Sequence, residues 1–267
     1  MSAAFDVVQH SLLLKKLSLY GFQEDVVECF SSYLSNRRQC VTINGTLSRL
    51  LPINSGVPQG SILAPLLYTL YTNELPEVLR KTNSSNDNAS EDQICCYADD
   101  TTLTCSSKCP TDLSKTFTEQ YGAVHNFMTD NGLKLKDDKT HLLVISQKKS
   151  KTKREYAQSV HIDTPTKKIS PTSQEKLLGC WIQDNLKWNY HIRDSEDNIL
   201  KSLNQRFGAL KLVTRLCNFK TRKILADGLF LSKLSYMLSI WANGTKELIN
   251  SIQVIQNKTT RILATKS

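Results

Sequence analysis

The sequence of 267 residues predicts an α+β protein, in which a front of mixed helices and antiparallel strands precedes an all-helical back. Short segments rich in β-branched, aromatic and small apolar residues, such as Val41–Ile43 and Ile94–Cys105, are interspersed with amphipathic helical segments in the front. In the last quarter, apolar residues recur only at helical spacing. We therefore expect three regions, which span 1–146, 147–193 and 194–267, and the middle one is a basic connection with a hairpin.

Each element has its own signal. A first helix ends at Gly21, a common stop residue, and Asn44-Gly45 is the strongest short hairpin signal, with a return strand over Leu47–Ile53. The polar run 81–92 predicts a solvent-exposed loop. We expect helices over 10–21, 23–35, 61–76, 111–130, 196–216, 220–240 and 246–264, strands around Asp99, a strand at 142–145, a broken basic segment over 147–176 and a hairpin over 175–188.

Charge is divided unevenly along the chain. The formal net charge is +9, but residues 1–140 carry −4 and residues 141–267 carry +13. This division predicts a cation-binding site joined to a track for a polyanion such as nucleic acid, and the alternative is a solvated basic surface. No apolar run reaches the roughly 20 residues that a membrane helix needs, so we expect no membrane association.

Eight cysteines are present, and their spacing does not match a zinc site. Cys95 and Cys96 are adjacent, and no second pair follows Cys105 and Cys109 at finger spacing. We expect buried, reduced thiols that act as small hydrophobes. This interpretation predicts an intracellular protein, cytoplasmic or nuclear.

The segment "ICCYADDTTLTC" places Asp99 and Asp100 between strand-forming residues. One interpretation is a solvated hairpin turn. The other is a tight turn that projects two hard-oxygen ligands toward Mg²⁺ or Mn²⁺, and such a site requires a further carboxylate from a neighbouring strand. The four letters "YADD" alone do not decide between them.

A second motif is the turn "SGVPQGS", in which Gly56 and Gly60 flank Pro58-Gln59. Glycines allow the backbone to approach a ligand closely, and Gln59 can both donate and accept hydrogen bonds. The alternative is an ordinary loop that caps the next helix. That helix is expected to begin at Ser61 and to place on its apolar side Leu63, Leu66, Leu67, Leu70 and Tyr71.

Together, "GVPQGSILAPLLYTLYTNELP" and "CYADDTTL" resemble the palm of the reverse transcriptases of LINE-type, non-LTR retrotransposons of the jockey-like kind. Other segments agree in order: "SAAFDVVQHSLLLKKLSLYGF" resembles the start of the palm, "YLSNRRQCVTINGTLS" the next hairpin, "MTDNGLKLKDDKTHLLVIS" the turn and strand after the active site, and "KLLGCWIQDNLKWNYHI" the primer-gripping hairpin. The resemblance covers essentially the entire chain. It implies a partial right-hand polymerase palm followed by a helical thumb.

The resemblance also implies roles for single residues. Asp99 matches a direct metal ligand and Asp100 a weaker or indirect one, with two Mg²⁺ or Mn²⁺ ions in an intact site. Phe5 matches the steric gate that discriminates deoxyribonucleotides from ribonucleotides. Leu178 and Gly179 match the primer grip.

Three further matches concern nucleotide and template contacts. Pro58, Gln59 and Gly60 match the segment beside the nascent base pair. Lys139 is a candidate general acid or electrostatic partner for the leaving pyrophosphate, although a lysine in a turn can equally be solvated. Arg37 and Arg38 are candidates for nucleic-acid contact, and the alternative is that they face water.

One residue of the family's pattern is missing. The family carries a metal-binding Asp two residues before the Ser of "SAAFD", and here that serine is Ser2. Asp6 matches a different, non-ligand position. We therefore expect an N-terminally truncated RNA-directed DNA polymerase, without its fingers and impaired alone, whose partners are an RNA template, a DNA primer and deoxynucleoside triphosphates. The alternatives are a non-catalytic nucleic-acid-binding protein derived from a reverse transcriptase, or an unstable fragment with no function.

Overall fold

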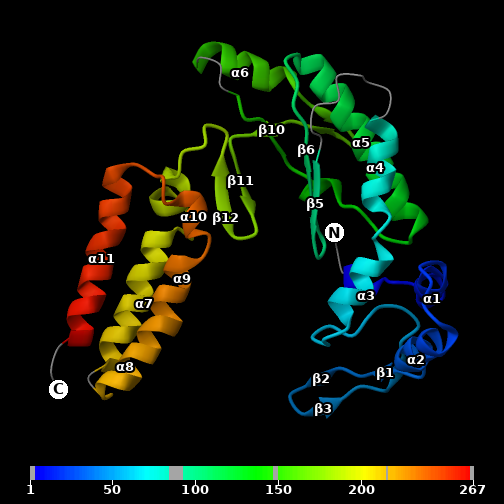
Figure 1. Ribbon diagram of the computed structural model, residues 1–267, viewed down its shortest axis with the longest axis horizontal. Helices are drawn as coiled ribbons and strands as arrows, with labels where there is room; N and C mark the ends of the chain where they lie inside the picture. Colours follow the sequence, from blue (N-terminus) through cyan, green and yellow to red (C-terminus); the bar gives the residue numbers. More distant parts are fainter. Residues whose placement is uncertain (1–3, 84–92, 147–149, 215, 265–267) are drawn as a thin grey trace. The chain divides into compact units, whose positions relative to one another are not determined.

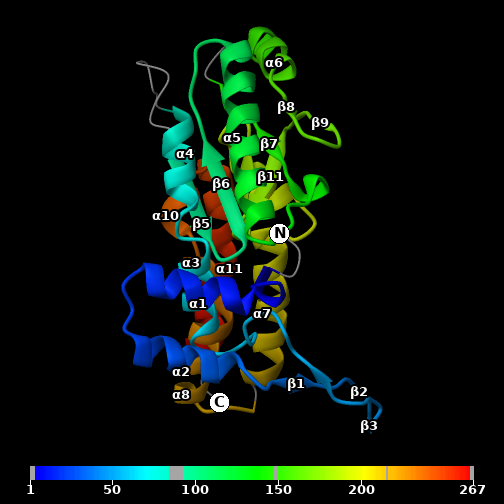
Figure 2. The ribbon, with the colours of Figure 1, turned by 90° about the vertical axis from the view of Figure 1, so that its right-hand side faces the viewer.

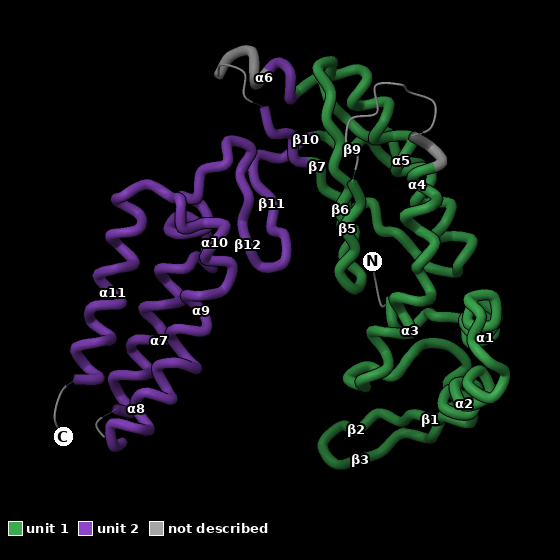
Figure 3. Tube along the Cα trace, in the orientation of Figure 1, with its two compact units in different colours: residues 1–142, 158–170 green, residues 143–157, 171–267 purple. Residues whose placement is uncertain are grey.

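The computed structural model describes residues 4–83, 93–146, 150–214 and 216–264. The chain divides into two compact units, residues 1–142 with 158–170 and residues 143–157 with 171–267 (Figure 3). Helices and small antiparallel two-stranded sheets occur together along the chain (Figure 1), which confirms the α+β class. In the described ranges, no helix has the length and apolar character needed to cross a membrane.

The first unit contains most of the strands. Its elements are η1 (Ala4–Asp6), α1 (His10–Leu19), α2 (Glu24–Leu34), β1 (Arg38–Gln39), β2 (Thr42–Ile43), β3 (Thr46–Leu47), β4 (Leu51–Pro52), α3 (Ala64–Tyr71), α4 (Leu75–Asn83), β5 (Gln93–Tyr97), β6 (Asp100–Thr104), α5 (Pro110–Asp130), η2 (Asp137–Lys139), β8 (Ile162–Asp163) and β9 (Lys168–Ile169). Two elements, β7 (Leu142–Leu143) and α6 (Ser150–Ser159), lie at the boundary between the units.

Helices α1, α3 and α5 form the core of the first unit, where Leu13, Leu67 and Met128 are buried. Helix α3 buries positions at helical spacing, namely Ala64, Leu67, Tyr68 and Tyr71. Leu66 is 52% exposed, so its predicted place on the buried side is wrong. It lies two residues from the buried Ala64, and residues two apart point to different sides of a helix.

The helix predicted over 61–76 is in fact two helices. Helix α3 begins at Ala64 and ends at Tyr71, and α4 starts at Leu75. Pro76 therefore lies in the first turn of α4, where a missing backbone N–H costs little. Helix α4 extends to Asn83, so the loop predicted over 81–92 is wrong for its first three residues, and 84–92 lie outside the described residues.

The hairpin predicted at Asn44-Gly45 is confirmed. Both residues have positive φ, 49° and 82°, as a two-residue turn of this type requires, and β2 pairs with β3 across it. The return strand is not continuous, because β3 and β4 are separate short strands. The resulting β1–β4 arm extends away from α1 and α2 (Figure 2). Five of its large apolar side chains are exposed: Val41, Ile43, Leu47, Leu50 and Leu51.

The segment 147–176 is more regular than predicted. It contains α6 and an antiparallel pair in which Ile162 lies opposite Ile169. The reason is a set of apolar side chains that are buried in an otherwise basic stretch: Tyr156, Val160, Ile162 and Ile169. Residues 147–149 lie outside the described residues.

The second unit is a hairpin followed by helices. Its elements are β10 (Pro171–Thr172), β11 (Gln174–Leu177), β12 (Cys180–Gln183), the π-helix η3 (Tyr190–Asp194), α7 (Ile199–Thr214), α8 (Phe219–Ala226), the π-helix η4 (Asp227–Leu231), α9 (Ser232–Ser235), α10 (Leu238–Trp241) and α11 (Lys246–Ala264). Helices α7, α8 and α11 pack against one another (Figure 1).

Helix α7 buries Ile199, Leu203 and Leu210, whereas Val213 is 41% exposed because it lies near the end of the helix. The helix predicted over 220–240 ends at Ser235, and Met237 has a φ of 52° that interrupts it. The bend lies next to Tyr236, which contacts the β11–β12 hairpin.

All eight cysteines are free thiols, as expected, but only Cys180 is buried. Cys29, Cys40, Cys95 and Cys96 are exposed. The prediction that the thiols are buried is therefore wrong for most of them. Cys40 follows β1, and Cys95 and Cys96 lie in β5, two short strands whose residues are mostly exposed, whereas Cys29 occupies an exposed position of α2.

Candidate active site

The β5–β6 hairpin presents Asp99 and Asp100 at its tip. Tyr97 lies opposite Asp100 in the pairing, so the turn consists of Ala98 and Asp99 alone. Ala98 has a φ of 51°, a conformation that costs a residue with a Cβ about 1–2 kcal/mol and is concentrated at functional sites. Asp99 is half-buried and Asp100 is exposed. The predicted hairpin is confirmed, and it places two carboxylates side by side at a strained turn.

Tyr68 of α3 connects this turn to the N-terminal segment. Its side chain is buried, and burial, followed by the negative charge of Asp99, raises the pKa of its phenol. The ring of Phe5 lies 4.9 Å from the ring of Tyr68, centroid to centroid. Phe5 packs against Tyr68 and the charge of Asp99 acts on its phenol, although 94 positions separate Phe5 from Asp99 in the sequence.

The glycine-rich turn is bound to the N-terminal segment by backbone hydrogen bonds. The N–H of Gly56 donates to the carbonyl of Val8, and the N–H of Val57 donates to the carbonyl of Phe5, both at 2.7 Å. A Cβ on Gly56 would lie 2.7 Å from the carbonyl oxygen of Asp6. Only glycine fits this approach without a shift of the backbone.

Gln59 makes a further contact between the glycine-rich turn and the N-terminal segment. Its Nε2 donates to Oδ1 of Asp6 at 3.0 Å, and both side chains are exposed. Gly60 has a φ of 82°, and the hydroxyl of Ser61 accepts a hydrogen bond from the N–H of Ala64 at 3.1 Å. The predicted turn before a helix is thus present, and Pro58 lies in it beside Gln59.

Lys139 lies in the short η2 turn and is exposed. The turn is fixed by the neighbouring Asp137, whose carboxylate accepts hydrogen bonds from the hydroxyls of Thr166, Tyr121 and Thr164. These hydrogen bonds lower the pKa of the Asp137 carboxyl, and the bond from Thr166 has the largest effect. Sequence reasoning missed Asp137, because its partners lie 16 to 29 residues away.

The two arginines of the candidate site differ in their surroundings. The guanidinium of Arg37 lies 5.4 Å from the ring centroid of Tyr33, and Nη1 donates to the Tyr33 carbonyl at 3.4 Å. Arg38 lies in β1 opposite Pro52 and is exposed. Arg37 therefore packs against α2, and Arg38 is the more accessible cation.

Leu178 and Gly179 belong to the second unit. They form the two-residue turn between β11 and β12, where Leu177 lies opposite Cys180. The hairpin predicted for this segment is confirmed.

The carboxylates of Asp99 and Asp100 are the donor type that Mg²⁺ and Mn²⁺ prefer. Within the ranges that the structure describes, no group of three or more His, Cys, Asp or Glu side chains could hold a metal ion. Asp99 and Asp100 are candidate ligands, and the described residues place no third side chain of these types in a group with them.

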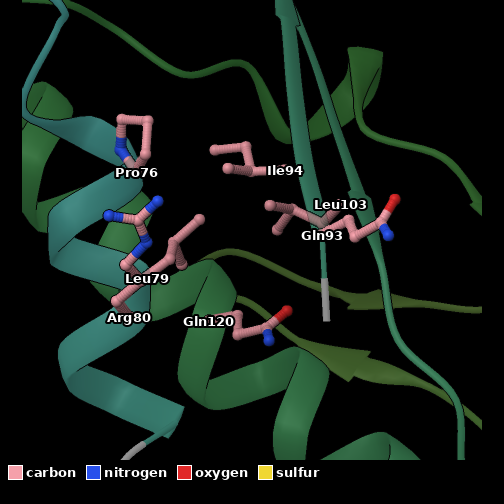
Figure 4. A pocket seen from close by; sticks show the side chains of 7 residues that line it. All are labelled: Pro76, Leu79, Arg80, Gln93, Ile94, Leu103 and Gln120. Carbon is pink, nitrogen blue, oxygen red and sulfur yellow. The ribbon is translucent and has the colours of Figure 1, made fainter. Parts of the chain in front are cut away.

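A separate cavity of about 340 Å³ lies between α4, α5 and the β5–β6 hairpin (Figure 4). Its lining residues are Pro76, Leu79, Arg80, Gln93, Ile94, Leu103 and Gln120. None of them is a predicted site residue, so the cavity is distinct from the group around Tyr68.

A family model of the reverse transcriptase (RNA-dependent DNA polymerase) matches residues 1–182. The chain therefore belongs to the reverse transcriptase family. It is 23% identical over 260 residues to a probable RNA-directed DNA polymerase from transposon X-element of Drosophila melanogaster. The alignment covers 97% of this chain and 27% of that protein. It is 26% identical over 265 residues to a probable RNA-directed DNA polymerase from transposon BS of the same organism. That alignment covers 98% of this chain and 28% of the relative.

The RNA-directed DNA polymerase from mobile element jockey of Drosophila funebris is 25% identical over 263 residues, 97% of this chain and 27% of that protein. The resemblance to LINE-type, non-LTR retrotransposon reverse transcriptases is thereby confirmed. The chain spans about 27–28% of the length of these three relatives.

Proposed function

We propose that the chain supplies the palm and thumb of an RNA-directed DNA polymerase. In this proposal the chain adds deoxynucleotides to a DNA primer on an RNA template. The arrangement of Phe5, Tyr68 and Asp99 supports this proposal, because a turn with two carboxylates and a bulky aromatic ring occur in one unit. The first unit corresponds to the palm, and the second unit contains the connecting hairpin and the thumb helices.

Asp99 and Asp100 act as metal ligands in this proposal. Two Mg²⁺ or Mn²⁺ ions bound there would activate the primer hydroxyl and stabilise charge on the phosphate. The half-buried Asp99 is the direct ligand, and the exposed Asp100 is the weaker or indirect one. The strained turn at Ala98 holds both carboxylates in place.

The other residues bind and orient the substrates. The Phe5 ring excludes the 2′-hydroxyl of a ribonucleotide, and Pro58, Gln59 and Gly60 lie along the nascent base pair. Gln59 is already oriented by its hydrogen bond to Asp6.

Three further positions contact nucleic acid or the leaving group. Exposed Arg38 binds a template phosphate, whereas Arg37 supports it from α2. Lys139 stabilises the leaving pyrophosphate, and Leu178 with Gly179 contacts the primer end.

We also propose that the chain alone is impaired. Two adjacent carboxylates repel each other and supply only part of the oxygen ligands that a divalent ion takes. In this proposal full activity needs a third carboxylate, and a site without one has a rate that is lower by several orders of magnitude.

Primer extension on an RNA template with Mg²⁺ or Mn²⁺ tests the proposal. The chain is compared with a version extended at its N-terminus by the corresponding residues of a longer relative, the polymerase from mobile element jockey. We expect strong incorporation from the extended version, and Asp99→Asn abolishes it. Asp112→Asn is the matched control, because Asp112 is an exposed carboxylate in the first turn of α5. Equal loss in both variants would contradict the assignment of Asp99.

A non-catalytic nucleic-acid-binding role is the second candidate. The net charge of +13 over residues 141–267 favours it. Binding to duplexes that weakens steeply with salt, needs no divalent ion and survives Asp99→Asn would support this role over catalysis.

A further inference from the structure

The turn between β11 and β12 has an unfavourable backbone for its sequence. Leu178 and Gly179 have φ values of 48° and 82°, so both are in the left-handed region. Two-residue turns of this kind favour Asn-Gly or Gly-Gly, because a Cβ in this conformation costs about 1–2 kcal/mol. Leucine has no side-chain polar group with which to offset that cost. Contacts from outside the turn must therefore hold Leu178 in place.

Tyr236 provides such contacts. Its hydroxyl donates a hydrogen bond to the carbonyl of Leu178 at 2.6 Å. Its ring carbon Cε1 lies 3.8 Å from the position that a Cβ on Gly179 would occupy. The tyrosine thus donates to one residue of the turn and lies beside the other, and it does so from the helical part of the same unit.

Tyr236 is itself held firmly at the break between α9 and α10. Met237 next to it has a φ of 52°, which turns the chain between the two helices. The indole Nε1 of Trp241 donates to the carbonyl of Tyr236 at 3.0 Å, and Trp241 is fully buried. The phenol is therefore attached to a fixed point of the helical core.

The strand that follows the turn is held by separate contacts. Cys180 is buried in the same core, and the N–H of Trp181 donates to Nδ1 of His191 at 3.3 Å. These contacts act on the first two residues of β12, directly after the turn. Tyr236 acts on the tip, where the two left-handed residues lie.

We infer that Tyr236 is a positioning residue that sets the geometry of the Leu178-Gly179 turn. The inference deepens the proposed function and rests on it in one respect, namely that this turn contacts the primer end. A reacting group displaced by about 1 Å can lose two orders of magnitude in rate. The hydroxyl of Tyr236 would then affect how well a bound primer is aligned, without contacting the reacting atoms.

The test compares the wild-type chain with Tyr236→Phe and with the matched control Tyr190→Phe. Tyr190 packs its ring against Trp181 at 5.0 Å on the same hairpin, and its hydroxyl has no hydrogen-bond partner among the described residues. Tyr236→Phe keeps the ring of a side chain that is 48% exposed, so the variant folds. Far-UV circular dichroism and the thermal midpoint verify this.

The first measurement is amide hydrogen exchange at residues 178–180. We expect exchange about tenfold faster in Tyr236→Phe and unchanged in Tyr190→Phe, because loss of the hydroxyl allows the turn to open locally. Exchange at the wild-type rate in Tyr236→Phe, or an equal acceleration in both variants, would overturn the inference. This measurement requires no polymerase activity.

The second measurement is single-turnover nucleotide incorporation on a prebound RNA–DNA template-primer, in the N-terminally extended polymerase. We expect a rate about 5- to 20-fold lower in Tyr236→Phe with the Kd for template-primer within twofold, because phosphate contacts dominate affinity. A loosened turn with an unchanged rate would support the role of Tyr236 and contradict the primer contact in the proposed function. The two failures are therefore distinguishable.

Discussion

The ring of Phe5 lies 4.9 Å from that of Tyr68, with the two planes tilted by 37°. Tyr68 is buried, and the pKa of its phenol is raised by burial and then by the charge of Asp99. The ring of the candidate gate and the charge of the candidate metal ligand therefore both act on one buried side chain.

Phe5→Val tests the gate. We expect discrimination between deoxyribonucleotides and ribonucleotides to fall by at least about tenfold, because the smaller side chain no longer excludes a 2′-hydroxyl. The measurement is the ratio of kcat/KM for the two nucleotide types in the N-terminally extended polymerase. Phe22→Val is the control, because Phe22 is an exposed phenylalanine that lies outside the site. An unchanged ratio in Phe5→Val would refute the gate.

Gly56→Ala tests the close approach to Asp6. The new Cβ would lie 2.7 Å from a backbone oxygen in a residue with a φ of 89°. We expect the free energy of unfolding to fall by about 2–4 kcal/mol, because steric overlap adds to left-handed strain.

Gly60→Ala is the matched control for that change. Gly60 has a φ of 82°, and no atom lies within 4 Å of the position that a Cβ would occupy there, so only strain of about 1 kcal/mol is expected. Urea unfolding measures both variants. Equal losses would show that the contact with Asp6 contributes nothing.

Glu74→Ala tests the buried cation of the first unit. The Lys16 ammonium forms an ion pair with Glu74, donates to the carbonyl of Tyr71 at 2.8 Å, and lies 5.4 Å from the ring centroid of Phe127. Its side chain is 6% exposed, so removing the carboxylate leaves a buried charge with less compensation.

We expect Glu74→Ala to lower the free energy of unfolding by about 1–3 kcal/mol, since water reaches the 42% exposed carboxylate and screens part of the pair. Glu77→Ala is the control. Glu77 pairs with Arg80 on the surface, and exposed pairs contribute under about 1 kcal/mol. Chemical unfolding at fixed pH measures the difference, and a larger loss in Glu77→Ala would contradict the prediction.

His191 predicts a pH dependence of stability in the second unit. Burial, followed by the charge of Lys233, lowers the pKa of its imidazole from 6.5 to about 4, and Lys176 acts in the same direction while Asp197 opposes it. The unfolded chain takes up a proton below pH 6.5, and the folded chain does so only near pH 4. The contribution of His191 to the free energy of unfolding is therefore fully present above pH 6.5 and is lost as the pH falls toward 4.

The expected loss over that window is about 2–4 kcal/mol. His191→Asn removes the titrating group, and the amide oxygen can still accept the hydrogen bond from the N–H of Trp181. The carboxyl of Asp197 has a pKa of about 2, so it titrates below this window. Unfolding free energies at about pH 7 and about pH 4.5 should differ less in the variant. The same difference in both proteins would rule out His191 as the source.

Local signals predicted much of the fold. Asn44-Gly45 specifies its turn because both residues tolerate positive φ, and helices α1, α5 and α11 follow from apolar spacing. The segment 147–176 was predicted to be broken, and its helix and hairpin were missed because its apolar residues are few. The hairpin also makes contacts with α5 that no local signal shows, such as the hydrogen bond from the Asp163 N–H to the Thr118 hydroxyl.

The candidate site was predicted only as separate motifs. Motif order indicated Phe5, Gln59 and Asp99, but nothing local indicates that Tyr68 joins them, since an i, i+4 pattern on α3 predicts a core residue and no more. Tyr236 was missed for the same reason. Its partner Leu178 lies 58 residues away, and the bend at Met237 depends on tertiary packing.

The contact between Gly56 and the backbone of Asp6 also has an evolutionary consequence. A side chain at position 56 displaces the segment that carries Phe5, so the two segments cannot diverge independently. Related proteins that lack glycine at this position should carry a compensating change in the N-terminal segment. The pair would then appear as covarying positions about 50 residues apart, with a steric cause visible in this structure.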